Sequence, residues 1–379
     1  MTGDAEASFA QRDVYLDWNA TTPPLGSVLD AMREGAAVAW GNPSSVHRTG
    51  RDARKVVESA REAVARLCGV EPRDVIFTSG ATEANNLALQ HAPALVTSRL
   101  EHPSVVRVAE ALAASGVVVR WVPVPETGAL RVEDVVEALV GLPDGFVVAL
   151  MAANHETGVL QPVAEVSRAV LDRGGRLHVD ASQAAGKVVG ELWRAGDTVA
   201  LAAHKLRGPK GIGALALRSS GLPRPVILGG AQERGIRPGT VDAVAAAGFG
   251  AAAFHAEHGG PERYGALAPL RDRLERAATP RARVNGTAPR LPHVSNLSFE
   301  GWLGDELVAA LDLEGVRTSS GSACSAGTVE RSPVIESMLG RARAESAIRV
   351  SLGDATTLED VEAAISVLDR TTARRTSRG

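Results

Sequence analysis

The sequence predicts an α/β protein whose mostly parallel sheet is flanked by helices and followed by a smaller α+β domain. Short apolar runs alternate with longer amphipathic segments until about residue 255, which is typical of a parallel sheet covered on both faces. Beyond that point the alternation weakens. The length of 379 residues suits roughly two domains of about 150 residues each.

The first part of the chain supplies the strands and helices of the large sheet. Apolar residues recur at spacings of three and four between 53 and 67, between 105 and 112 and between 163 and 170, which predicts three covering helices. The Ala/Gly-rich run 243–254 is shorter than the ~18 residues needed to span a bilayer, so we expect a packed helix there and no membrane contact. The expected strands are 74–78, 94–97, 117–121, 146–150, 176–179 and 198–201.

The last third of the chain predicts the smaller domain. A charged helix over 261–278 and a loop over 285–290 precede an alternating strand with one exposed face over 293–299, and a helix follows over 305–313. We therefore expect a large domain over 14–255 and a small one made from 1–13 and 256–370. The polar, basic end 371–379 is expected to be a flexible tail.

Composition excludes several classes of protein. The net charge of −3 gives no electrostatic footprint for nucleic acid or an anionic membrane. Residues 1–13 have neither a basic start nor an apolar run, so we expect no secretory signal and a cytoplasmic protein. Cys68 and Cys324 are far apart in the sequence, which excludes a disulfide scaffold and a zinc knuckle and leaves no expected metal site.

A strand-to-helix turn at 79–86 is a candidate anion site. Small residues and the open end of a helix let backbone N–H groups approach an anion, and the Thr82 hydroxyl beside Ala81 adds a donor. A plain tight turn is the alternative for so short a pattern. The absence of a Walker lysine and of a G-x-G-x-x-G run argues against a nucleotide.

Asp180 and Lys205 each follow a predicted strand. A carboxylate at that edge could hold a protonated heterocyclic nitrogen, although a helix N-cap is the simpler alternative for Asp180. Lys205 lies among other cations in the segment 202–211, where a lowered pKa would free its amine to form a Schiff base. Of the other lysines, Lys55 and Lys187 lack such neighbours, and Lys210 is either a rival or simply solvated.

Cys324 lies in a run of small polar residues at 317–328. We expect an exposed, mobile loop there, in which a thiolate would be reactive. Cys68, at the end of a predicted helix, is expected to be buried as a small apolar residue. Weaker signals are His102, His155, Asn42 and Arg349, which each have a structural alternative, and the long polar loop 229–240, which is typical of an interface or an active-site wall.

Taken together and in this order, these segments resemble the cysteine desulfurases of the class V aminotransferase group, which are fold-type I pyridoxal-phosphate enzymes. The resemblance runs from Tyr15-Leu16-Asp17-Trp18-Asn19-Ala20-Thr21-Thr22-Pro23 to Ser351-Leu352-Gly353. It implies a homodimer that converts L-cysteine to L-alanine and passes the sulfur to an acceptor protein. An iron–sulfur scaffold or a tRNA-thiolation enzyme is the implied acceptor.

The resemblance also implies a role for each candidate residue. Lys205 would carry pyridoxal 5'-phosphate, and Cys324 would take the sulfur as a persulfide. Arg349, with Asn42, would bind the substrate carboxylate. The remaining contacts with the cofactor would come from Asp180 at the ring nitrogen, Gln183 at the ring oxygen, His102 stacked on the ring and moving protons, and Ala81, Thr82, His204 and the partner subunit's Thr240 at the phosphate.

Two positions depart from the family pattern. His155 stands where the family usually has Asn, and an imidazole can also donate to the ring oxygen, so we expect tuning rather than loss. Ala202 stands where Ser is usual, which removes one phosphate hydroxyl and is expected to weaken retention of the cofactor. The alternatives to a cysteine desulfurase are a selenocysteine lyase, another enzyme of the same group, or an inactive scaffold.

Overall fold

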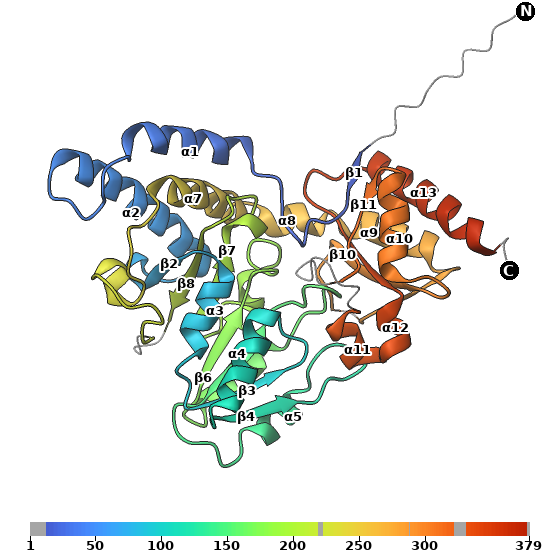
Figure 1. The fold of residues 1–379 in the computed structure, drawn as a ribbon, viewed down its shortest axis with the longest axis horizontal. Helices are drawn as coiled ribbons and strands as arrows, with labels where there is room; N and C mark the ends of the chain where they lie inside the picture. The colour runs from blue at the N-terminus through green and yellow to red at the C-terminus, as the bar shows by residue number, and fades with distance from the viewer. Residues whose placement is uncertain (1–12, 219–222, 288, 322–330, 377–379) are drawn as a thin grey trace, which may run out of the picture.

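The computed structural model describes residues 13–218, 223–287, 289–321 and 331–376. Its large sheet has seven strands in the order β2-β8-β7-β6-β5-β3-β4, all parallel to their neighbours except β8, which is antiparallel to both β2 and β7 (Figure 1). The predicted mostly parallel sheet is therefore confirmed. The strands are β2 (Val75–Thr78), β3 (Ala94–Ser98), β4 (Val118–Val122), β5 (Val147–Met151), β6 (Arg176–Asp180), β7 (Thr198–Ala202) and β8 (Gly213–Leu217).

Strand β8 is an element that the sequence did not indicate. Its residues, Gly-Ala-Leu-Ala-Leu, have weak strand propensity, and every one of them is buried between β2 and β7. Glycine is required at its start, because a Cβ on Gly213 would lie 2.6 Å from the Cα of Gly80. Packing, not local preference, makes this strand.

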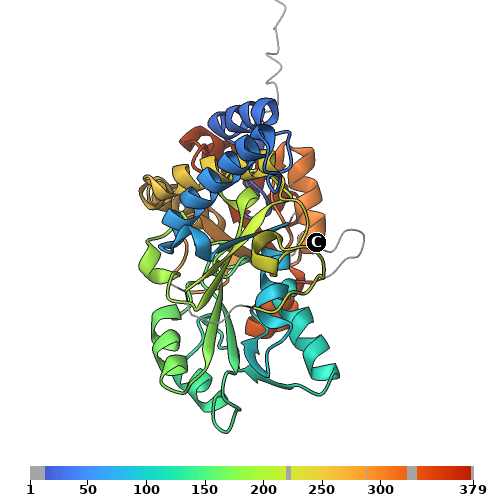
Figure 2. The same ribbon diagram turned by 90° about the vertical axis from the view of Figure 1, so that its left-hand side faces the viewer.

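Helices cover both faces of the large sheet (Figures 1 and 2). Residues of α2, α6 and α7 share a core with alternate strand residues such as Val148 and Leu150, whereas α3 and α4 pack on the intervening ones, for example Leu95 and Val147. Small residues bring α7 close to α2, since a Cβ on Gly250 would lie 2.8 Å from the Cα of Ala60. The helices are α1 (Gly26–Val38), α2 (Arg48–Cys68), α3 (Ala81–Leu89), α4 (Pro103–Ala114), α5 (Val132–Ala138), α6 (Val163–Leu171) and α7 (Ala243–Glu257).

A second core lies on the right of Figure 1. An antiparallel sheet, β12-β10-β9, and a parallel pair, β1-β11, are packed by α9, α10 and α13. Helices α11 and α12 instead contribute Val334, Ile335 and Ala344 to the core of the large sheet. The elements are β1 (Val14–Tyr15), β9 (Ala282–Val284), β10 (Val294–Phe299), β11 (Val316–Arg317), β12 (Ala347–Ser351), α8 (Gly260–Gly265), α9 (Ala268–Ala278), α10 (Gly304–Leu313), α11 (Pro333–Leu339), α12 (Arg341–Glu345) and α13 (Leu358–Thr376).

Several expectations for this region need correction. The tail expected from residue 371 is wrong for its first part, because α13 continues to Thr376 and buries Thr371 and Thr372. Strand β10 is buried throughout rather than exposed on one face. The charged helix expected over 261–278 is two helices, α8 and α9. Val14, expected at the start of the large domain, pairs with Val316 and packs in the second core.

Within the part of the chain that the structure describes, no helix combines the length and the apolar character that crossing a membrane requires. The division into two domains remains a prediction, because α11 and α12 join the core of the large sheet from the far end of the chain.

Candidate active site

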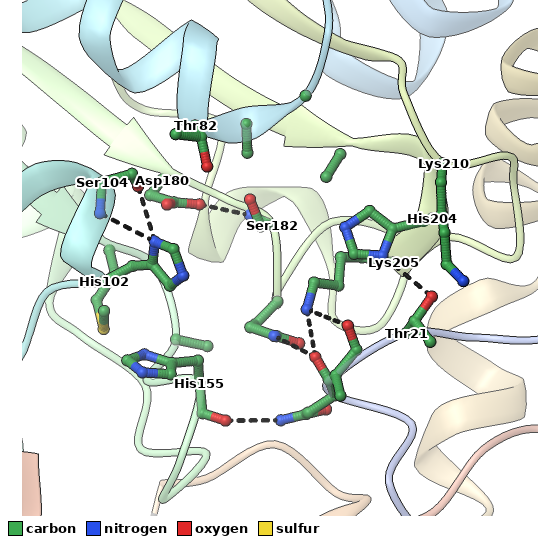
Figure 3. A pocket seen from close by; sticks show the side chains of 18 of the residues that line it. Thr21, Thr82, His102, Ser104, His155, Asp180, Ser182, His204, Lys205 and Lys210 are labelled. Carbon is green, nitrogen blue, oxygen red and sulfur yellow. Dashed lines mark hydrogen bonds between the residues drawn. The ribbon is translucent and has the colours of Figure 1, made fainter. Parts of the chain in front are cut away.

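A cavity of about 460 Å³ lies at the carboxyl edge of the large sheet (Figure 3). The neighbouring parallel strands β6 and β7 end there, as do the turns that lead into α3 and α4, and such an edge is the usual ligand site of a parallel sheet. Residues 19–21 and Arg349 close the other side. The volume lies within the range of about 300–1,000 Å³ that is typical of small-molecule sites.

Lys205 reaches this cavity from the end of β7, through the short helix η3 (Ala203–Lys205). Its Nζ donates hydrogen bonds to the backbone carbonyls of Asn19 and Ala20, the latter at 2.9 Å. Carbonyl oxygens hold the amine in position without neutralising its charge. Lys210 also lines the cavity, but its side chain is exposed at the mouth.

Asp180 faces the same cavity from the end of β6, and neutral donors fix both of its oxygens. The backbone N–H of Ser182 donates to Oδ1 at 2.9 Å, and the Asn85 amide donates to Oδ2 at 2.8 Å. The Oδ1 atom of Asn85 in turn lies 2.9 Å from His178 Nε2, and His178 Nδ1 lies 2.8 Å from Thr198 Oγ1. A hydrogen-bonded chain therefore runs behind the carboxylate.

Burial decides the charge of His178 in that chain. The ring is 1% exposed, and desolvation lowers its pKa to about 4 despite the opposing charge of Asp180. A neutral His178 donates from Nε2 to Asn85, so the Asn85 amide has its N–H groups free to turn toward Asp180 and Ser104 Oγ. No cation takes part in this chain of hydrogen bonds to Asp180.

Two histidine rings, His102 and His155, lie near each other at the cavity, as Figure 3 shows. His102 is the N-cap of α4, and its Nδ1 accepts from the backbone N–H of Ser104 at 3.1 Å, which leaves Nε2 on the cavity side. His155 meets it edge to face with ring centroids 5.5 Å apart. Desolvation lowers the pKa of both rings, and that of His155 falls well below the ordinary value. Both are neutral at pH 7.

The opposite end of the cavity suits an anion. Helix α3 begins there with Ala81 and Thr82, and His204 packs against Thr21 with Nδ1 3.2 Å from Oγ1. Burial lowers the pKa of His204 to about 4, assisted by the charges of Lys205, Lys187 and Lys210. The open N–H groups of α3 and these lysines create a positive potential that favours a negative group.

Arg349 and Gln183 also line the cavity. Arg349, 3% exposed, donates to the His155 carbonyl at 3.1 Å and to Asp17 Oδ1 at 2.7 Å. Gln183 Nε2 donates to the Asn19 carbonyl at 3.1 Å. Both side chains are therefore anchored by a bond to a backbone carbonyl.

Two predicted site residues, Asn42 and Thr240, do not line this cavity. Asn42 lies exposed before α2, where its Oδ1 accepts from the backbone N–H of Ser44, and Thr240 is exposed at the end of the loop 229–240. Neither is among the described residues around the cavity. Cys324 lies outside the described residues. Cys68 is buried as expected, which raises the pKa of its thiol to about 12.

The residues present fit the expected pyridoxal phosphate by the chemistry of their donors. A primary amine and a carboxylate face one cavity from neighbouring strands, with a helix N-terminus at its far end. Among the described residues, Ser182 Oγ, His155 Nδ1 and Arg349 Nε are buried at this cavity with no hydrogen-bond partner. Buried polar atoms without partners are rare in folded proteins, and these three indicate a polar ligand.

Sequence reasoning missed the residues behind the cavity. Nothing in the sequence singles out Asn85, His178 or Ser104 within their motifs. Their hydrogen-bond partners are distant in the chain, and no local pattern predicts them. Lys187 was placed in a loop without cationic neighbours. The structure corrects this, because Lys187 is buried and its pKa is lowered by that burial and, to a smaller extent, by the charge of Lys205.

Comparison with known proteins agrees with this geometry. Residues 14–364 match the family model for class V aminotransferases. A cysteine desulfurase of Cereibacter sphaeroides is 41% identical over 371 residues, covering 94% of each chain. An IscS-like cysteine desulfurase of Mycobacterium tuberculosis is 38% identical over 381 residues, covering 95% of this chain and 96% of the relative. The solved structure of a NifS-like protein has a TM-score of 0.86 at 32% identity and covers 96% of this chain and 100% of that one.

Proposed function

This chain belongs to the cysteine desulfurases of the class V aminotransferase family, which depend on pyridoxal phosphate, and from that premise we propose that its cavity removes the sulfur of L-cysteine and that Cys324 receives it. The observation that carries the proposal is the pairing of Lys205 and Asp180 in one cavity, from the ends of neighbouring strands.

Each wall of the cavity has a proposed task toward the cofactor. Pyridoxal phosphate, when bound, supplies an electron sink that makes the substrate sulfur electrophilic. Lys205 would hold it covalently, and Asp180 would keep its ring nitrogen protonated. The other holding residues would be Gln183 and His155 at the ring oxygen, and Ala81, Thr82 and His204 at the phosphate.

The neutral His102 is the proposed proton carrier. Its Nδ1 is occupied by the backbone N–H of Ser104, so only Nε2 can accept a proton on the cavity side. Arg349 already donates to Asp17 and to the His155 carbonyl, and its buried Nε still lacks a partner. That uncommitted donor supports the proposed hold on the substrate carboxylate.

The sulfur transfer balances without an outside oxidant. The Cys324 thiolate would bond to the substrate sulfur, the carbon–sulfur bond would break, and its electron pair would go to the substrate carbon, which takes a proton and becomes the methyl group of alanine. Cys324 sulfur is oxidised to a persulfide while the carbon is reduced. The persulfide would pass to an acceptor protein of iron–sulfur assembly or tRNA thiolation, in the reducing cytoplasm.

Exposed apolar side chains support the proposed homodimer. Trp40 and Val46 flank Asn42, and Ile227 and Leu228 precede the loop that carries Thr240; these four are 76%, 86%, 54% and 85% exposed. Apolar residues gathered on loops with predicted site residues fit a subunit interface. We expect light scattering to give twice the chain mass, and Leu228→Glu to shift the protein toward monomer. A monomeric wild type would contradict the dimer.

The test of the proposed function locates the sulfur directly. We expect the holoenzyme, after incubation with L-cysteine, to carry one added sulfur on the peptide that contains Cys324, as read by mass spectrometry. Cys324→Ala should abolish sulfide release, and Cys68→Ala should leave it unchanged because that thiol is buried. Undiminished sulfide release by Cys324→Ala would overturn the persulfide role. Activity with selenocysteine alone would identify a selenocysteine lyase.

A further inference from the structure

Lys187 is a buried cation that the mechanism above does not use. It ends the turn 181–187 after β6, and its side chain is 2% exposed. Its Nζ donates to Gln183 Oε1 at 3.0 Å and lies 5.8 Å from the centroid of the Tyr264 ring. Among the described residues, no carboxylate forms an ion pair with it.

The contact with Gln183 fixes the orientation of a carboxamide. An ammonium group can only donate, so Gln183 must turn its oxygen toward Lys187 and its N–H groups toward the cavity. Gln183 Nε2 then donates to the Asn19 carbonyl, the same carbonyl that accepts from Lys205 Nζ. A carboxamide is nearly symmetric in shape, so without Lys187 it could reverse at little steric cost.

A buried amine without a counter-ion is costly, and an apolar side chain of similar length would fill the same space. Desolvation, together with the charges of Lys205 and Arg349, lowers the pKa of Lys187 to about 7. The groups that face it are Lys205 on η3, Arg349 on β12, Tyr264 on α8, and His293, whose own pKa Lys187 helps to lower. A small cavity beside it is also lined by Arg207, His255, Arg263 and the carboxylate of Asp354. The placement of Lys187 beside Lys205 and Arg349 indicates that this site binds an anionic ligand.

We propose that Lys187 is a positioning residue, which locks the Gln183 carboxamide with its N–H toward the bound cofactor and maintains positive potential beside Lys205. The inference rests on the proposed function, because the cofactor is the group that Gln183 would meet. Lys187 does not line the cavity, but it would help to set the protonation of the linkage between Lys205 and the cofactor.

The test is a pH titration of the visible absorbance of the lysine-linked cofactor in holoenzyme. We expect Lys187→Met to raise the midpoint by about one pH unit, since a positive neighbour and a fixed donor are both lost. Lys187→Gln keeps a donor without the charge and should give a smaller rise. The surface variant Lys55→Met should not move the midpoint.

A double variant separates positioning from charge alone. In a Gln183→Met background, Lys187→Met should add less than half of its shift in the wild type. An equal shift in both backgrounds, or no shift at all, would overturn the inference. If Lys187→Met loses the cofactor, equilibrium dialysis of apoenzyme with pyridoxal phosphate replaces the titration, and we expect about tenfold weaker binding; unchanged binding counts against the inference. A wild type without visible absorbance would instead refute the proposed function.

Discussion

The carboxylate wall of the cavity (Asp180, backed by Asn85, His178 and Ser104) and its cation wall (Lys205 and Arg349, backed by Lys187) carry opposite charges and support them differently. On the first, neutral donors saturate the carboxylate, and a buried neutral histidine orients them. On the second, backbone carbonyls and one carboxamide hold the amines. Arg349, which reaches Asp17, is the exception.

The comparison shows how a fold keeps charge available for a ligand. Had Asp180 formed an ion pair with an arginine, its charge would have been neutralised inside the protein. Dipolar partners, such as the backbone carbonyls that accept from Lys205, fix the position of a charged group without cancelling its charge. The site therefore fits a molecule that is cationic at one end and anionic at the other.

The largest effect should come from removing the amine of the cation wall. We expect Lys205→Ala to lower the rate of sulfide release from L-cysteine by about 10³-fold or more, since no other described lysine is held inside the cavity. It should also lose the visible absorbance of the lysine-linked cofactor. Lys210→Ala, at the cavity mouth, is the matched control and should retain the absorbance. Retention by Lys205→Ala would show that another lysine carries the cofactor.

Removing Asn85, whose amide donates to Asp180 in the carboxylate wall, should have the next largest effect. Asn85→Ala removes a hydrogen bond to the charged Asp180, which is worth about 1.5–3 kcal/mol, so we expect cofactor binding at least tenfold weaker in equilibrium dialysis. Asn86→Ala, on the exposed side of the same helix, should bind normally. Equal binding by both variants would mean that the hydrogen-bonded chain does not support Asp180.

The neutral histidine of the carboxylate wall should make stability depend on pH. His178 has a lowered pKa of about 4 when folded and an ordinary pKa near 6.5 when unfolded, so the unfolded chain binds the extra proton between these values. The free energy of unfolding should therefore fall as pH drops from 7 to 5, by about 1–2 kcal/mol from this residue. Urea unfolding at both pH values measures the change, and His178→Gln should reduce it. An identical pH dependence in the variant would exclude His178 as a source.

The smallest effect should come from a second carboxyl group beside the cavity. Glu101 accepts a hydrogen bond from the backbone N–H of Met151. Burial raises the pKa of this carboxyl well above its ordinary value. The native state therefore keeps Glu101 neutral until the pH rises through the raised pKa. Because the unfolded chain ionises this carboxyl at pH 7 and the native state must hold its proton, Glu101→Gln should raise the free energy of unfolding at pH 7. Asp180→Asn, by contrast, should lose cofactor. Strong destabilisation by Glu101→Gln would mean that Glu101 is ionised.

The sequence by itself determined the strands of the large sheet, apart from β8, and the edge at which Lys205 and Asp180 meet. Hydrophobic periodicity is local, and the carboxyl ends of parallel strands converge in any such sheet. Only the tertiary structure decided which groups stand behind them. Asn85 and His178 are 93 positions apart and meet because α3 packs across β6 and its neighbours β7 and β8. The sequence predicted Lys187 in a loop and Thr371 in a flexible tail, and both are buried by packing in the structure. Burial and partnership depend on contacts distant in sequence, and no local pattern encodes them.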